Sequence, residues 1–121
     1  MKFIIHRINT IEKLKKIPKE YGCEIDIRSN GSNLILNHDP FKNGDFFNDY
    51  LDEYKHDTLI LNIKESGIED LVLQEVRKRN IKKFFFGIIY YLIEILGSYK
   101  FFYDTYKKKN SQTNTNCIFL G

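Results

Sequence analysis

The chain has few cysteines, no strong excess of either charge sign and no long apolar run at its start. Its two cysteines, Cys23 and Cys117, lie far apart and belong to no CxxC or Cys/His pattern, which argues against a disulfide framework and against a zinc site. The apolar stretch within residues 1–6 is too short for the core of a signal peptide. We therefore expect a cytoplasmic protein.

The 19 basic and 16 acidic residues are interleaved and leave a net charge of +3, a poor signature for a nucleic-acid-binding protein. The single basic run, residues 107–109, is typical of a solvated tail. With 121 residues, of which 42% are hydrophobic, the chain is long enough for one domain with a core. We expect a small-molecule ligand and no nucleic acid.

Short apolar runs alternate with helical patterns along most of the chain. We expect strands at residues 2–6, 23–28, 58–64 and 81–86, with a short extended segment at 34–36. Helices are expected after Thr10, over residues 46–53, and from a capping box at Ser66-Gly67-Ile68-Glu69 to about Asn80, with Leu71 on its buried stripe. Strands separated by helices of this size predict an α/β fold with a parallel sheet.

The last part of the chain has a different character, so we divide it at residue 86. Eleven of the thirteen residues from 84 to 96 are apolar, and the final dozen are mostly polar. A transmembrane helix over residues 84–103 is one interpretation, but Glu94 and Lys100 interrupt it. A packed strand followed by an amphipathic helix is favoured, and membrane association is not expected.

The second predicted strand carries two carboxylates on one face. Alternation places Glu24, Asp26 and Arg28 on one side of the strand and the apolar residues between them on the other. Burying both carboxylates without partners would cost several kcal/mol each. An interior face therefore predicts a bound cation, whereas an edge strand would allow a solvated face balanced by Arg28.

Other polar residues follow strands at their carboxyl ends. His6 and Lys64 stand at the carboxyl ends of predicted strands, and His38 follows the extended segment at 34–36. In parallel barrels, functional groups gather where strands end. Each of these residues alone is more typical of an ordinary surface position, but their joint order and spacing favours a site.

Three motifs, His6-Arg7, Glu24-x-Asp26 and His38-Asp39, together resemble the glycerophosphodiester phosphodiesterase family and its phospholipase-like relatives. The resemblance covers residues 3–64 and extends to about residue 86. It implies a TIM barrel, which needs ~250 residues. This chain is about half that long, so the resemblance implies the N-terminal half: a partial TIM-type (βα) barrel with about four parallel strands, open at its edges and therefore prone to form a homo-oligomer.

The resemblance also implies a reaction, the metal-dependent hydrolysis of a glycerophosphodiester-type substrate. His6 and His38 match the two family histidines that work as acid and base or nucleophile. The remaining matches are Glu24 and Asp26 for ligands of a divalent metal, calcium or magnesium, and Arg7 and Lys64 for groups that hold the phosphate.

Two departures from the family pattern weaken the expected metal site. Family members carry a Glu-Asn-Thr element after the first motif, whereas here Asn9-Thr10 follows almost at once without the glutamate. Asn62 stands where the third family strand supplies a metal-binding glutamate, and it can offer only a neutral carbonyl oxygen. We expect weaker metal binding. The alternative function is a non-catalytic remnant or interaction module that pairs through its open sheet edge.

Overall fold

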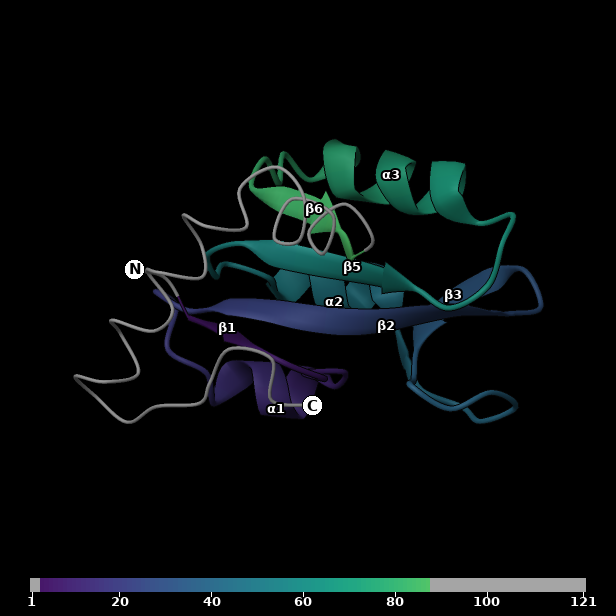
Figure 1. Ribbon diagram of the computed structural model, residues 1–121, viewed down its shortest axis with the longest axis horizontal. Coiled ribbons are helices and arrows are strands. Elements are labelled where there is room, and N and C mark those ends of the chain that lie inside the picture. The colour runs from purple at the N-terminus through teal and green to yellow at the C-terminus, as the bar shows by residue number, and fades with distance from the viewer. Residues whose placement is uncertain (1–2, 88–121) are drawn as a thin grey trace, which may run out of the picture.

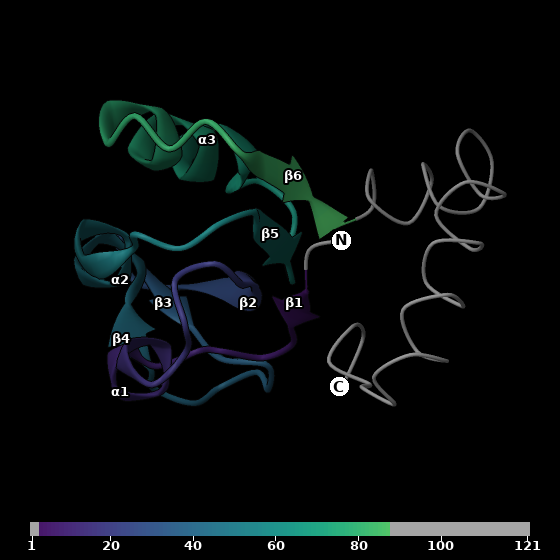
Figure 2. The same cartoon turned by 90° about the vertical axis from the view of Figure 1, so that its left-hand side faces the viewer.

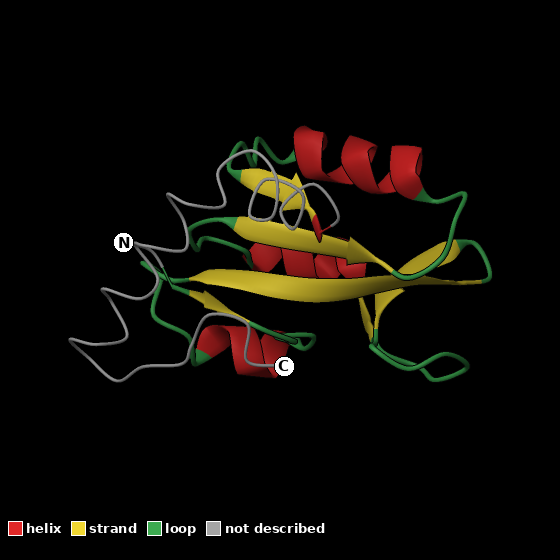
Figure 3. Ribbon diagram, viewed as in Figure 1, coloured by secondary structure: helices red, strands yellow, loops and turns green. Residues whose placement is uncertain are grey.

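The structure is a computed structural model that describes residues 3–87. It is a mixed α/β fold built on an open six-stranded sheet (Figures 1 and 3). The elements in chain order are β1 (Ile4–Ile5), α1 (Ile11–Lys15), β2 (Gly22–Asn30), β3 (Asn33–Leu36), β4 (Asp45–Phe46), α2 (Phe47–Glu53), β5 (Leu59–Ile63), α3 (Glu69–Lys78) and β6 (Phe84–Phe86).

Strand β2 is the centre of the sheet. One of its edges pairs in parallel with β5, and the other pairs in parallel with β1 near its start and antiparallel with β3 near its end. Because β6 pairs in parallel with β5, four parallel strands lie in the order β1-β2-β5-β6. The predicted α/β class is confirmed, while the antiparallel β3–β4 ribbon was not expected.

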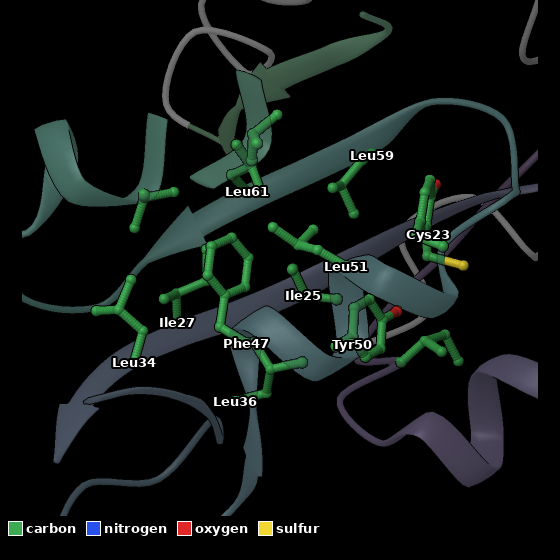
Figure 4. Packing of buried hydrophobic residues seen from close by; sticks show 14 of the residues in the cluster. Cys23, Ile25, Ile27, Leu34, Leu36, Phe47, Tyr50, Leu51, Leu59 and Leu61 are labelled. Carbon is green, nitrogen blue, oxygen red and sulfur yellow. The ribbon is translucent and has the colours of Figure 1, made fainter. Parts of the chain in front are cut away.

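The core lies on one face of this sheet. Cys23, Ile25 and Ile27 of β2 have no exposed surface and pack in one cluster with residues of β5 and α2 (Figure 4). The three helices within residues 3–87 lie on the same side of the sheet (Figure 2). Burying a side chain of this size contributes about 1.5–3 kcal/mol, so the helices are held to this face and not to the other.

The close approach of strands depends on one glycine. A Cβ atom at Gly22 would lie 2.3 Å from the carbonyl oxygen of Thr58, a backbone atom that cannot move aside cheaply. Gly22 is also paired with Ile4 of β1. Its lack of a side chain therefore allows β1 and β5 to flank the same stretch of β2.

Capping residues in the sequence predict the start of α1 correctly and the start of α3 wrongly. Thr10 caps α1 as predicted, because its hydroxyl accepts a hydrogen bond from the Lys13 backbone N–H at 3.1 Å. The capping-box prediction for α3 is wrong: the N-cap is Ile68, which makes no side-chain cap bond, and the Glu69 carboxylate accepts from the Gly67 N–H instead. Leu71, predicted to be buried, is 43% exposed.

Three predicted strands are shorter in the structure, and the one expected at 58–64 is Leu59–Ile63. The strand expected at 2–6 is only Ile4–Ile5, because the chain turns at Arg7 with a φ of 56°. The strand expected at 81–86 begins at Phe84. The predictions for 88–121, including the apolar segment, lie outside the described residues. Between residues 3 and 87, no helix is long and apolar enough to cross a membrane.

Candidate functional site

The two carboxylates of β2 lie on the face of the sheet that the helices leave uncovered. Glu24 and Asp26 alternate with the core residues of the same strand, yet they are only 5% and 1% exposed. Strand β2 is central to the sheet and not an edge strand, so the interpretation as a solvated edge face is wrong. Buried carboxylates require compensating partners.

The turn after β1 folds over Glu24. The Arg7 backbone N–H donates to Glu24 Oε1 at 3.2 Å, and the next amide, that of Ile8, donates to the Glu24 carbonyl oxygen at 3.0 Å. The His6 ring lies beside the same carboxylate, with Nδ1 3.4 Å from Oε1. The left-handed conformation of Arg7 turns the following chain so that the Ile8 amide reaches the Glu24 carbonyl oxygen, and the bonds to Glu24 offset the strain of that turn.

Asp26 is held by neutral amides and one cation. Asn9 Nδ2 donates to Oδ2 at 2.9 Å, and Asn9 Oδ1 accepts from the Asp26 backbone N–H at the same distance. Asn62 Nδ2 donates to Oδ1 at 3.2 Å, and Lys64 Nζ lies 3.6 Å from that oxygen. The carboxylate thus has three donors around it, which compensates its burial.

His38 is brought to the same region by the loop that follows β3. Its Nδ1 lies 3.1 Å from Asp39 Oδ1, and its Nε2 lies 3.1 Å from Arg7 Nη2. A guanidinium can only donate, so Nε2 accepts the hydrogen bond from Arg7. Nδ1 therefore carries the ring proton and donates a hydrogen bond to Asp39 Oδ1. The hydrogen bond with His38 is the main cause that lowers the pKa of Asp39 below its usual value.

Arg28 orients this loop and does not balance the carboxylates. Its Nη2 donates to the His38 carbonyl oxygen at 2.8 Å, and its Nε donates to the Asn37 carbonyl oxygen at 3.2 Å. The cation beside Asp26 is Lys64 instead, which the sequence assigned to the phosphate. Arg28 is therefore a positioning residue for the His38 backbone.

Arg7 joins the three sequence motifs into one cluster. Its backbone contacts Glu24, its side chain contacts His38, and its neighbour His6 contacts Glu24. These residues come from segments 31 positions apart in the chain. The sequence grouped them by order alone, and the structure brings Arg7, Glu24 and His38 into contact.

The site offers oxygen ligands but few of them. Within residues 3–87, no group of three or more His, Cys, Asp and Glu side chains is arranged to hold a metal ion. The oxygen donors on the open face are the carboxylates of Glu24 and Asp26 and the amide of Asn62, whose nitrogen faces Asp26. Magnesium sites often use only one or two carboxylates and fill the rest of the shell with water and phosphate oxygens.

Burial lowers the pKa of His6 below its ordinary value of 6.5. The negative charges of Glu24 and Asp26 act in the opposite direction and partly offset this effect, while Arg7 adds to it. His6 is therefore the neutral imidazole at pH 7, with a lone pair able to accept a proton.

Asn9 is the site residue that sequence reasoning missed. In the sequence, Asn9 stands in the Asn9-Thr10 pair that departs from the family pattern, which gives it no predicted role. In the structure it makes two hydrogen bonds with Asp26. The available signal was its position two residues after Arg7, just past a strand end. An amide there can satisfy a donor and an acceptor of the neighbouring strand at once.

No family model, no curated protein and no solved structure matches this chain. The similarity to glycerophosphodiester phosphodiesterases therefore stays a prediction that depends on the three motifs and on their arrangement in space.

The lowered pKa of His6 makes the stability of the fold pH-dependent. The unfolded chain takes up a proton near pH 6.5, whereas the folded chain resists protonation until a lower pH. The contribution of His6 to the free energy of unfolding is therefore fully present above pH 6.5. It is lost as the pH falls through the lower pKa that His6 has in the folded chain. NMR titration of the His6 ring should give a midpoint below 6.5.

Glu24→Gln should lower that midpoint further, because it removes a charge that raises the pKa of His6. Glu12→Gln, on the exposed side of α1, is the matched control and should leave the titration unchanged. A midpoint at or above 6.5 in the unmodified protein would contradict this assignment.

Asn9→Ala should destabilise the fold by about 1–3 kcal/mol, because it leaves the buried Asp26 carboxylate and its amide short of partners. Urea unfolding followed by circular dichroism measures the change. Asn48→Ala, an exposed position on α2, should stay within about 0.5 kcal/mol of the unmodified chain. Equal unfolding midpoints for the two variants would show that the Asn9 contacts contribute nothing.

Proposed function

We propose that this site binds a phosphodiester and hydrolyses it with the help of a divalent cation, and that the substrate is of the glycerophosphodiester type. The observation that supports this most is the position of Arg7 between the Glu24 carboxylate and the His38 ring. It brings together a carboxylate pair, two histidines and a cation, the groups that phosphodiester hydrolysis requires.

Two cations are available for the phosphate. Arg7 presents a guanidinium on the surface, where its planar donors match two non-bridging phosphate oxygens. Lys64 is 25% exposed and provides a second positive charge at the end of β5. Negative charge grows on these oxygens during displacement, so fixed cations favour the transition state.

Glu24 and Asp26 are the residues that would hold the cation, with the carbonyl oxygen of Asn62 as a third donor if the amide turns over. Hard oxygen ligands suit magnesium or calcium. When bound, such an ion neutralises charge on the phosphate and helps to orient it. Because the Lys64 ammonium lies beside Asp26, the two carboxylates would bind the cation only weakly. The phosphate of the substrate would add oxygen ligands and strengthen that binding.

The two histidines divide the proton transfers. His6, neutral at pH 7, removes a proton from the attacking water while the water oxygen bonds to phosphorus. The bond from phosphorus to the alcohol oxygen breaks, and that oxygen takes a proton from His38 Nε2, which takes up this proton from solvent once Arg7 no longer donates to it. Asp39 holds the His38 ring through Nδ1, which leaves Nε2 for the substrate once Arg7 turns toward the phosphate.

The fold is consistent with a partial TIM-type barrel, which we include in the proposal. The parallel order β1-β2-β5-β6 follows the chain, and every helix of the part that the structure describes lies on one side of the sheet. His6 directly follows β1, and Lys64 directly follows β5. Catalytic residues of such barrels come from the carboxyl ends of several strands.

The alternative proposal is an interaction module without catalysis. The edge strand β6 pairs with β5 on one side, and within the described part of the chain no strand covers its other side. Phe85 of this strand is 41% exposed. An open edge with an exposed aromatic residue can pair with another chain, including a second copy.

An assay with a chromogenic phosphodiester and added Mg²⁺ or Ca²⁺ tests the proposal. His6→Ala and His38→Ala should each lower turnover at least ~100-fold, the usual effect of removing a general acid or base. The third histidine, in His56→Gln, is the matched control and should keep turnover near that of the unmodified chain. Equal turnover, or none in any form, would favour the interaction module.

Asn62→Glu tests the cation site directly. The new carboxylate would lie beside Asp26, where the Asn62 amide now donates at 3.2 Å. Calorimetric titration should show about tenfold tighter Mg²⁺ binding, which corresponds to ~1.4 kcal/mol. Without metal, the same change should lower stability, because a hydrogen bond is replaced by repulsion between like charges.

The control for this variant is Asn62→Gln, which keeps a neutral amide and should not tighten metal binding. If Asn62→Glu changes neither the affinity for Mg²⁺ nor the metal-free stability, residue 62 is not part of a cation site with Asp26.

A further inference from the structure

We infer that anion binding at Arg7 regulates the protonation of His38, so that the proposed acid takes up its proton only when the ligand is bound. The coupling depends on a contact between these two side chains that the ligand must break. The identification of the ligand as a phosphodiester rests on the proposed function, whereas the coupling follows from the contact itself.

The contact between Arg7 and His38 holds the imidazole in its neutral form. Arg7 Nη2 lies 3.1 Å from His38 Nε2. A guanidinium has donors only and stays charged in proteins, so Nε2 must offer its lone pair to it. A proton on Nε2 would point at another N–H group and would add a second positive charge at the same short distance. While Arg7 keeps this position, His38 cannot serve as an acid.

The partner of the other ring nitrogen acts in the opposite direction. His38 Nδ1 lies 3.1 Å from Asp39 Oδ1, and a carboxylate beside an imidazole favours the charged form of the ring. The hydrogen bond with His38 and the nearby Lys42, whose Nζ lies 3.5 Å from Oδ2, lower the pKa of Asp39 and keep its carboxylate ionised. Asp39 therefore favours proton uptake by His38 as soon as Arg7 withdraws.

Two further charged groups act on His38 and do not change when Arg7 moves. Arg28 Nη2 donates to the His38 carbonyl oxygen at 2.8 Å, and Lys42 stays beside Asp39. Neither interaction involves the Arg7 side chain. The difference between the two protonation states of His38 is therefore set by the position of Arg7 and by the charge of the ligand that replaces it.

A phosphodiester is a better partner for the guanidinium than the imidazole is. The planar donors of Arg7 match two phosphate oxygens at once, and both partners are charged, whereas His38 Nε2 is one neutral acceptor. The Arg7 side chain is exposed and free to turn, while its backbone N–H stays bonded to Glu24 Oε1 at 3.2 Å. The anion therefore frees Nε2 without unfolding the turn, and its own negative charge favours the imidazolium.

The coupling has to be reciprocal. If a bound anion promotes the protonation of His38, protonated His38 must strengthen anion binding by the same factor. The affinity for the anion should therefore fall as the pH rises. This dependence can be measured without metal and without turnover, and it separates a regulated acid from a histidine that only packs beside Arg7.

Dimethyl phosphate is the probe, because it carries one negative charge throughout the neutral pH range. NMR of the ring nitrogens reports the protonation of each histidine separately. At pH 7 we expect Nε2 of His38 to become protonated as dimethyl phosphate is added in the absence of divalent metal. The affinity should fall about threefold from pH 7 to pH 8, which corresponds to the uptake of about half a proton.

Three variants separate the parts of the coupling. His38→Gln should still bind dimethyl phosphate, with an affinity that no longer falls over this pH range. Arg7→Gln should raise the protonated fraction of His38 before any anion is added, because the competing guanidinium is gone. His56→Gln is the matched control, since that ring contacts the Ile17 carbonyl oxygen instead, and it should behave like the unmodified chain.

The coupling is overturned if dimethyl phosphate does not bind, if it binds without protonating His38, or if His6 takes up the proton instead. An Arg7→Gln variant in which the protonation of His38 is unchanged would also overturn it. The proposed hydrolysis is tested separately by the chromogenic assay. Proton uptake by His38 without hydrolysis would leave the coupling in place and contradict the proposed function.

Discussion

The need to compensate the charges of two buried carboxylates on strand β2 organises the part of the structure around them. Glu24 and Asp26 lie on the central strand of the sheet and are almost fully buried, so the surrounding segments must supply donors. The turn after β1 supplies backbone amides and Asn9, and β5 supplies Asn62 and Lys64. The same requirement for donors that stabilises the fold therefore gathers the polar groups of the proposed site.

Much of the fold could be predicted because apolar periodicity reports burial directly. The alternation in Cys23, Ile25 and Ile27 identified β2 and its buried face, and the predicted extended segment at 34–36 corresponds to β3. The β3–β4 ribbon could not be predicted, since β4 has only two residues and no pattern of its own. The predicted start of α3 is wrong because serine is a typical N-cap residue, which made Ser66 the expected cap. The actual N-cap is Ile68, two residues later.

The site was predicted as a set of residues but not as a set of contacts. Strand alternation correctly placed Glu24 with Asp26, since this follows from backbone geometry alone. It could not show that Arg28 bonds loop carbonyl oxygens while Lys64 lies beside Asp26, because long side chains choose partners by tertiary arrangement. The contact of Arg7 with His38 depends on a turn with positive φ, which no local pattern at an arginine predicts.

The left-handed backbone at Arg7 sets stability against the proposed function at a single residue. Glycine would adopt this conformation without strain, and it would keep the backbone bond to Glu24. Glycine would also remove the guanidinium that reaches His38. A more stable fold would thus favour glycine at this position, whereas the proposed phosphate site requires the arginine side chain.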